Sequence, residues 1–200
     1  DQEAVPSRQF DISKIDFDLL SREFAHTRRK NLLLRDLDEL VNQQLAKMLF
    51  ANPQRIDYYD RYQEIIDAYN AEQNRATIEK TFMDLMELAN SLDTEQQRYV
   101  REGFSSDEEL SVYDLLFSEN LTKQEIETIK KVSVDLLTKI KQQIAKLDHW
   151  TDKQETKAIV DNLIRNTLWQ ELPNSYDVSD IQTYQKKIYE YVYMRYPEVA

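Results

Sequence analysis

The stretch TKQEIETIKKVSVDLLTKIKQQIAKL, residues 122–147, decides the fold class of this protein. Its apolar residues recur at three- and four-residue spacing over about seven turns: Ile126, Ile129, Val132, Leu136, Ile140, Ile144 and Leu147. This is the period of an amphipathic α-helix. Thr122 stands three residues before Glu125, which is the spacing of a capping box that starts a helix. The stretch therefore predicts a long helix with one buried face.

Similar spacing on both sides of this stretch predicts further helices, at roughly 12–24, 31–52, 54–74, 78–92, 106–117, 151–171 and 180–196. Pro53 ends the second of them, because the residue before a proline is pushed out of the helical region. Thr94 to Gln97 also has the form of a capping box and predicts that a short helix restarts there. Gly103, the only glycine, is expected to end that helix in a left-handed conformation.

The scarcity of turn residues supports the same fold class. The chain of 200 residues has one glycine and four prolines, whereas sheets and compact βα units need more turn glycines. We therefore expect an all-α protein, an irregular bundle of about seven to eight helices with short polar loops. Residues 1–11 are polar, contain Pro6 and show no period, so they predict a flexible lead-in.

Charge and hydropathy limit the classes of function. Acidic residues outnumber basic ones by 37 to 26, and the net charge of −11 argues against independent binding to nucleic acid. No apolar run approaches the roughly 18 residues that a membrane span needs, and mean hydropathy is −0.70. Cysteine is absent, which fits a cytoplasmic protein. The chain begins at Asp1 without a signal sequence, and we expect it to be a segment of a larger protein.

Complete catalytic or nucleotide-binding motifs are missing from the sequence. One glycine cannot supply a Walker A loop or a dinucleotide fingerprint, which need two and three. His26 ends a Glu-x-x-His motif, but di-iron bundles need that motif from two helices. Glu155-Thr156-Lys157 resembles half of a nuclease metal site, yet the chain has no Pro-Asp pair to complete it. We therefore expect no catalytic, cofactor-binding or metal-binding residue in this segment.

Two basic features are candidate contacts to DNA or to an acidic partner. One is the turn Arg28-Arg29-Lys30, and the other is the helix 122–147. Residues 123–148 include six lysines and four acidic residues. Three of the lysines fall on nearly the same side of the helix: Lys123, Lys130 and Lys141. Alternatively, lysine stems cover the apolar stripe while their ammonium groups stay in water, and we favour this second interpretation.

The last predicted helix is rich in tyrosine: Tyr184, Tyr189, Tyr191, Tyr193 and Tyr196. Tyrosine buries area while keeping a polar group, so these residues could form a base-stacking or partner surface. They could equally dock the last helix onto the core. The sequence leaves both interpretations open.

A pattern of short segments is spread along the chain over roughly residues 12–197. It comprises Ile15–Phe17, Asn52–Arg55, Tyr62–Asn70, Gly103–Ser105, Leu110–Leu116, Ile129–Val132, Leu136-Leu137, Trp150–Lys153, Leu172-Pro173 and Val192-Tyr193. In this pattern the chain resembles the C-terminal region of the restriction (R) subunit of type I restriction-modification enzymes. No single segment is a catalytic signature, and the order and spacing make the resemblance specific.

The resemblance implies a place within a larger assembly. In that family the R subunit has a nuclease domain and two RecA-like motor domains, which use ATP and Mg²⁺ to translocate and cut DNA. Its C-terminal domain is thought to hold the subunit on the methyltransferase core. By this analogy residues 12–52 would be a helical linker toward the motor domains, and residues 53–200 the C-terminal assembly domain. The family's catalytic residues have no counterparts in this chain.

Two hypotheses follow from the resemblance and the residues together. In the first, the segment tethers the R subunit to the methyltransferase (M) subunit, and through it to the specificity subunit. It would also contact the motor domains of its own chain, meet DNA only in the full complex and contact no membrane. In the second, the segment is an auxiliary DNA-contacting module that uses the lysine-bearing helix 122–147.

Overall fold

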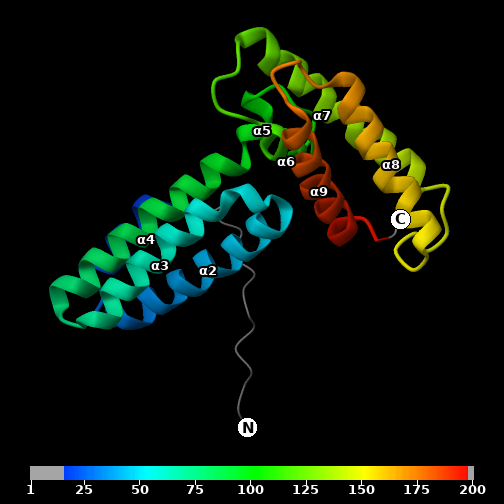
Figure 1. Ribbon diagram of the computed structural model, residues 1–200. Coiled ribbons are helices and arrows are strands. Elements are labelled where there is room, and N and C mark those ends of the chain that lie inside the picture. Colours follow the sequence, from blue (N-terminus) through cyan, green and yellow to red (C-terminus); the bar gives the residue numbers. More distant parts are fainter. Residues whose placement is uncertain (1–15, 198–200) are drawn as a thin grey trace. The chain divides into compact units, whose positions relative to one another are not determined.

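The computed structural model describes residues 16–197, and these residues contain nine α-helices, one short 3₁₀ helix and no strand (Figure 1). Eight of the nine helices have ten or more residues. The all-α class and the predicted number of helices are thus confirmed for the described part of the chain. The predicted flexible lead-in, residues 1–11, lies outside the described residues.

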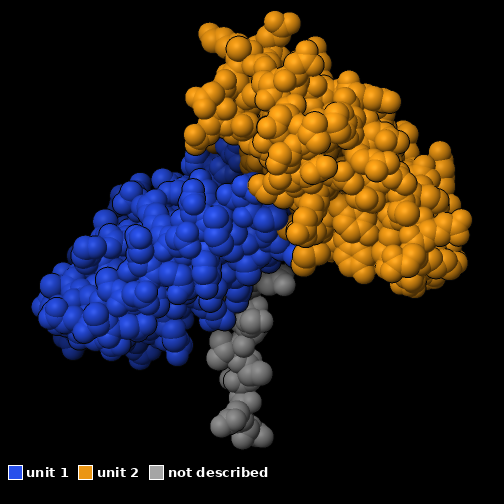
Figure 2. All heavy atoms as spheres, viewed as in Figure 1, with its two compact units in different colours: residues 1–98 blue, residues 99–200 orange. Residues whose placement is uncertain are grey.

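The chain divides into two compact units, Asp1–Arg98 and Tyr99–Ala200 (Figure 2). The buried apolar side chains also form two clusters, one in each unit. This boundary is geometric, whereas the predicted division into a linker and an assembly domain concerns function. That functional division stays a prediction.

Unit 1 contains α1 (Phe17–His26), α2 (Lys30–Ala51), the 3₁₀ helix Pro53–Arg55, α3 (Ile56–Ala71) and α4 (Arg75–Gln96). Helix α4 packs against both α2 and α3, which lie beside it in Figure 1. The apolar stripe of α2 is buried against them: Leu34, Leu37, Val41, Leu45 and Met48. Helix α2 ends at the predicted place, with Asn52 as its C-cap residue. The Asn52 Oδ1 atom then accepts from the Gln54 N–H at 3.1 Å and so caps the 3₁₀ helix that follows. The result is a core centred on α4.

Unit 2 contains α6 (Asp107–Leu116), α7 (Lys123–Ile144), α8 (Gln154–Glu171) and α9 (Val178–Arg195), and the short α5 (Arg98–Arg101) begins at the last residue of unit 1 and continues into unit 2. Helix α6 contacts α7, α7 contacts α8, α8 contacts α9, and α9 contacts α6. These four helices therefore enclose one core (Figure 1). The stripe of α7 is buried in it as predicted: Ile129, Val132, Leu136, Ile140 and Ile144. The Thr122–Glu125 capping box is confirmed, with reciprocal hydrogen bonds of 2.8 and 3.2 Å.

Among the local predictions about helix ends, the capping role of Thr94 was wrong, whereas the start of the last helix and the conformation of Gly103 were confirmed. Thr94 caps no helix, because α4 continues through it to Gln96 and its hydroxyl donates to the Asn90 carbonyl at 3.0 Å. The expected short helix does follow, as α5 (Arg98–Arg101). The last helix begins at Val178, within two residues of its predicted start, and Asp177 and Asp180 form a capping box there. Gly103 has a φ of 84°, as its expected left-handed conformation requires.

Candidate functional site

The basic turn between α1 and α2 has two exposed arginines and one engaged lysine. Arg28 and Arg29 are exposed, whereas Lys30 is half-buried. The Lys30 ammonium donates to the Phe24 carbonyl at 3.0 Å and lies 4.4 Å from the centre of the Phe24 ring. It also lies 3.5 Å from Glu79 Oε1. Of the three predicted contact residues in this turn, Lys30 thus helps to join α1 to α4.

An open hollow of about 630 Å³ lies beside this turn, and four of its lining side chains are cationic: Arg28, Arg29, Lys30 and Arg75. We call it the basic hollow. Thr27, Asn31, Leu32 and Ile78 complete its lining, which contains no acidic residue. Glu79 lies next to it, with its Oε1 atom 3.3 Å from Arg75 Nε. The hydrogen bond from Arg75 lowers the pKa of Glu79, so this carboxylate stays ionised and offsets one of the four positive charges.

Two of the three predicted contact lysines on α7 have acidic partners inside unit 2. Lys130 donates to the carbonyl and to Oε2 of Glu102, at 3.0 and 3.1 Å. Its ammonium also lies 5.9 Å from the ring centres of Phe104 and Tyr113. Lys141 pairs with Glu108 and lies 5.2 Å from the ring centre of Tyr196. These contacts join α7 to the segments around it.

Acidic residues accompany the α7 lysines more widely. A hollow of about 550 Å³ beside Lys130 and Lys131 is also lined by Glu102, Glu127 and Asp135. Lys139 bridges Asp135 and Glu171, and hydrogen bonds to these two carboxylates raise its pKa. Lys123, Lys131 and Lys146 are exposed. The arrangement favours the interpretation that the lysines cover the apolar stripe, while a contact of Lys123, Lys130 or Lys141 with DNA or a partner stays a prediction.

The tyrosines of α9, and Tyr196 directly after it, mostly contact other residues of unit 2. Trp150 is completely buried, and its indole N–H donates to the Tyr196 carbonyl at 2.6 Å. The rings of Tyr189 and Tyr193 meet the Trp150 ring edge-on, with centres 6.1 and 5.7 Å away. Tyr191 is buried, and of the five tyrosines Tyr184, Tyr189, Tyr191, Tyr193 and Tyr196 only Tyr193 is exposed. The contacts therefore support docking of α9 onto the core around Trp150.

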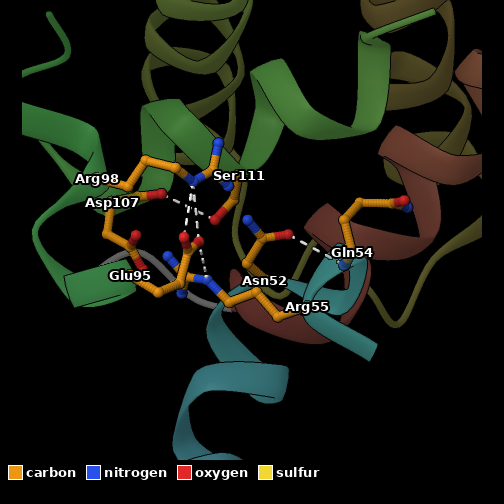
Figure 3. A network of polar contacts seen from close by, with 7 residues as sticks. All are labelled: Asn52, Gln54, Arg55, Glu95, Arg98, Asp107 and Ser111. Carbon is orange, nitrogen blue, oxygen red and sulfur yellow. Dashed lines mark hydrogen bonds and ion pairs between the residues drawn. The ribbon is translucent and has the colours of Figure 1, made fainter. Parts of the chain in front are cut away.

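A buried ionic network in unit 1 escaped sequence reasoning (Figure 3). The Arg55 guanidinium donates to Glu95 Oε1 at 3.0 Å, and both side chains are almost fully buried. Arg98 reaches both oxygens of the same carboxylate at 3.0 and 2.9 Å. One signal was available, because Glu95 stands three residues after Leu92 and continues the apolar stripe of α4. A charged residue at a stripe position indicates a buried partner.

The described residues also bear on catalytic chemistry. Within residues 16–197, no three His, Asp, Glu or Cys side chains gather in a way that could hold a metal ion. Glu155-Thr156-Lys157 lies in the first turn of α8, a helix as predicted, rather than on the strands of a nuclease site. No helix in this part of the chain is long and apolar enough to cross a membrane.

Comparison with known proteins identifies the family. Residues 3–196 match the family described as type I restriction enzyme HindI endonuclease subunit-like, C-terminal. The chain belongs to this family. No curated protein and no solved structure matches the chain significantly. The resemblance noted in the sequence is thus confirmed over nearly the whole chain, which is the C-terminal domain of a type I restriction enzyme endonuclease subunit.

Proposed function

We propose that this chain tethers a type I restriction endonuclease subunit to its methyltransferase core. The observation that supports the proposal is family membership: residues 3–196 form the C-terminal domain of such a subunit. The helices of this chain supply packed cores and exposed side chains. In this proposal the catalytic chemistry belongs to other domains of the parent protein. In this view the ATP and Mg²⁺ of the reaction act at the motor and nuclease domains of the parent protein. A role in cutting DNA inside the cell gives our proposal a cytoplasmic location.

The partner in this proposal is the M subunit and, through it, the specificity subunit. A half-exposed aromatic side chain offers an anchor for such a contact. Trp169, near the end of α8, is 50% exposed, although tryptophan is highly buried on average. Tryptophan is also among the residues that contribute most to binding at protein interfaces. Trp169 is therefore our first candidate for an interface residue.

Capture of the M subunit tests the tether. The purified chain is immobilised and incubated with a methyltransferase core of M and specificity subunits, and we expect binding at about micromolar concentration or better. Trp169→Ala should weaken it about 30-fold, the loss of roughly 2 kcal/mol that an interface hot spot causes.

Met83→Ala is the matched control, because Met83 is also exposed, at 59%, but lies on α4 of unit 1. We expect this variant to bind like the unaltered chain. Failure of the unaltered chain to capture the core would contradict the tether itself. Capture that is lost in Met83→Ala and kept in Trp169→Ala would retain the tether and move its face to unit 1.

A further inference from the structure

The two hollows that contain predicted contact residues differ in charge. The hollow beside Lys130 is lined by two lysines and three acids: Glu102, Glu127 and Asp135. The basic hollow is lined by four cations and no acid, and Glu79 beside it offsets one of these charges. Three positive charges therefore remain unmatched among these residues. Of these two hollows, the basic hollow therefore has the larger net positive charge.

The fold gathers these charges from two distant parts of the chain. Arg28 and Arg29 come from the turn before α2 and Lys30 is the first residue of α2, whereas Arg75 is the first residue of α4. Lys30 and Arg75 share Glu79, which holds the two segments together. The Arg75 side chain is 84% exposed, and both other arginines are exposed as well. The cations can thus reach a ligand in solvent without a rearrangement of the helices.

The composition of the basic hollow favours phosphate as the anion. Three of its four cations are arginines, whose planar guanidinium groups bind phosphate oxygens in pairs. Its volume of about 630 Å³ and its open form suit a chain of phosphates better than one enclosed ion. The net charge of −11 acts against such binding only nearby, because salt screens charges beyond about 8 Å at physiological ionic strength. The family is named for an endonuclease subunit, and an endonuclease acts on nucleic acid.

We propose that the basic hollow binds the phosphate backbone of double-stranded DNA through Arg28, Arg29 and Arg75. Lys30 positions the turn through its contacts with Phe24 and Glu79. The contact is independent of sequence, because it involves phosphates and no base edges. It adds a DNA contact to the chain and does not depend on the proposed tether.

Fluorescence anisotropy of a labelled DNA duplex of about 20 base pairs tests the proposal, with the whole chain titrated at several salt concentrations. Three phosphate contacts predict a slope of about −2.7 in the plot of log affinity against log salt. Affinity should then fall roughly 20-fold between about 50 and 150 mM salt. Absence of salt-dependent binding by the unaltered chain would overturn the proposal.

Paired substitutions locate the contact. The variant Arg28→Ala/Arg29→Ala should reduce the slope to about −0.9, whereas Arg28→Lys/Arg29→Lys keeps the charges and most of the slope. Lys123→Ala/Lys131→Ala removes the same charge from exposed positions on α7 and should leave the slope unchanged. Circular dichroism of each variant checks that the helices are intact.

Two results would overturn the assignment of the basic hollow to DNA. One is equal loss of DNA binding in the arginine and the lysine variants, which would indicate a general effect of charge. The other is loss of methyltransferase capture in Arg28→Ala/Arg29→Ala with DNA binding intact, which would assign the arginines to an acidic protein surface.

Discussion

The central helices of the two units, α4 and α7, have the same length of 22 residues but bury different side chains. The buried residues of α7 are apolar except for Ser133, whose hydroxyl donates to the Ile129 carbonyl of its own helix at 2.7 Å. Helix α4 buries Glu95, which needs Arg55 and Arg98 as partners. Unit 2 instead buries Trp150 completely.

Both units have a core of buried apolar side chains, and unit 1 adds a buried ion pair to its core. A buried tryptophan stabilises unit 2 through the apolar area that it removes from water. A buried ion pair adds little net stability, because desolvation offsets the attraction, but the loss of one partner leaves an uncompensated charge. Unit 2 is therefore sensitive to lost volume, and unit 1 is sensitive to lost charge balance.

The two tryptophans make the comparison measurable. Trp150 and Trp169 both lie in unit 2, and unit 1 has none. Tryptophan fluorescence thus follows unfolding of unit 2, while far-ultraviolet circular dichroism follows the helices of both units.

The largest effect is expected for Trp150→Ala. This substitution leaves a cavity in the core of unit 2 and removes the hydrogen bond to the Tyr196 carbonyl. We expect the free energy of unfolding of unit 2 to fall by about 4 kcal/mol. Urea denaturation followed by the fluorescence of Trp169 measures this loss. Trp169→Ala, followed through Trp150, is the control and should change stability by less than about 1 kcal/mol; a similar loss in both variants would contradict the contrast.

A slightly smaller effect is expected for Glu95→Ala in unit 1. The substitution leaves the buried Arg55 guanidinium without its carboxylate, which typically costs about 3 kcal/mol. Circular dichroism in urea should show early loss of the helices of unit 1, with the fluorescence transition of unit 2 unchanged.

Glu87→Ala is the matched control on the same helix. Glu87 pairs with Arg61 at 3.1 Å, but its side chain is 73% exposed. An exposed pair contributes about 0–1 kcal/mol, so this variant should unfold almost like the unaltered chain. An equal effect of Glu87→Ala and Glu95→Ala would show that burial of the network adds nothing to unit 1.

The same contrast explains how much of the fold could be predicted from the sequence. Helix α7 was predicted well because burial follows a strict period and Thr122 and Glu125 mark its start. The predicted capping role of Thr94 was wrong, because a serine or threonine inside a helix can donate its hydroxyl hydrogen bond to the carbonyl four residues before it. Glu95 was missed because its partner Arg55 is 40 residues away, and pattern analysis detects neighbours on one helix only.

The candidate site was predictable in composition but not in pairing. The sequence placed Lys130 and Lys141 on one face of a helix, which is correct, but it could not show that Glu102 and Glu108 lie against them. It likewise found the Arg28-Arg29-Lys30 turn without Arg75, which tertiary packing brings to the same hollow. Charges from different elements combine only in the folded chain.

The smallest effect is expected at the capping box of α7, and it depends on pH. The hydrogen bond from the Thr122 backbone N–H lowers the pKa of Glu125 below its usual 4.5. A carboxylate with a depressed pKa stabilises the fold above the pKa of the unfolded chain, and this contribution is lost as pH falls through the folded pKa. Glu125→Gln imitates the protonated acid, so it should unfold at a lower temperature than the unaltered chain at pH 7.

That difference should shrink steadily as pH falls below 4.5, because the unaltered chain then becomes protonated at Glu125 too. Thermal unfolding followed by tryptophan fluorescence at several pH values measures it within unit 2. Glu127→Gln, at an exposed position on the same helix but outside the capping box, is the control and should show a smaller dependence. A constant difference across pH would mean that Glu125 acts through packing alone. A difference that vanishes in acid would show that unit 2, whose core is apolar, still uses a charge to fix where its central helix begins.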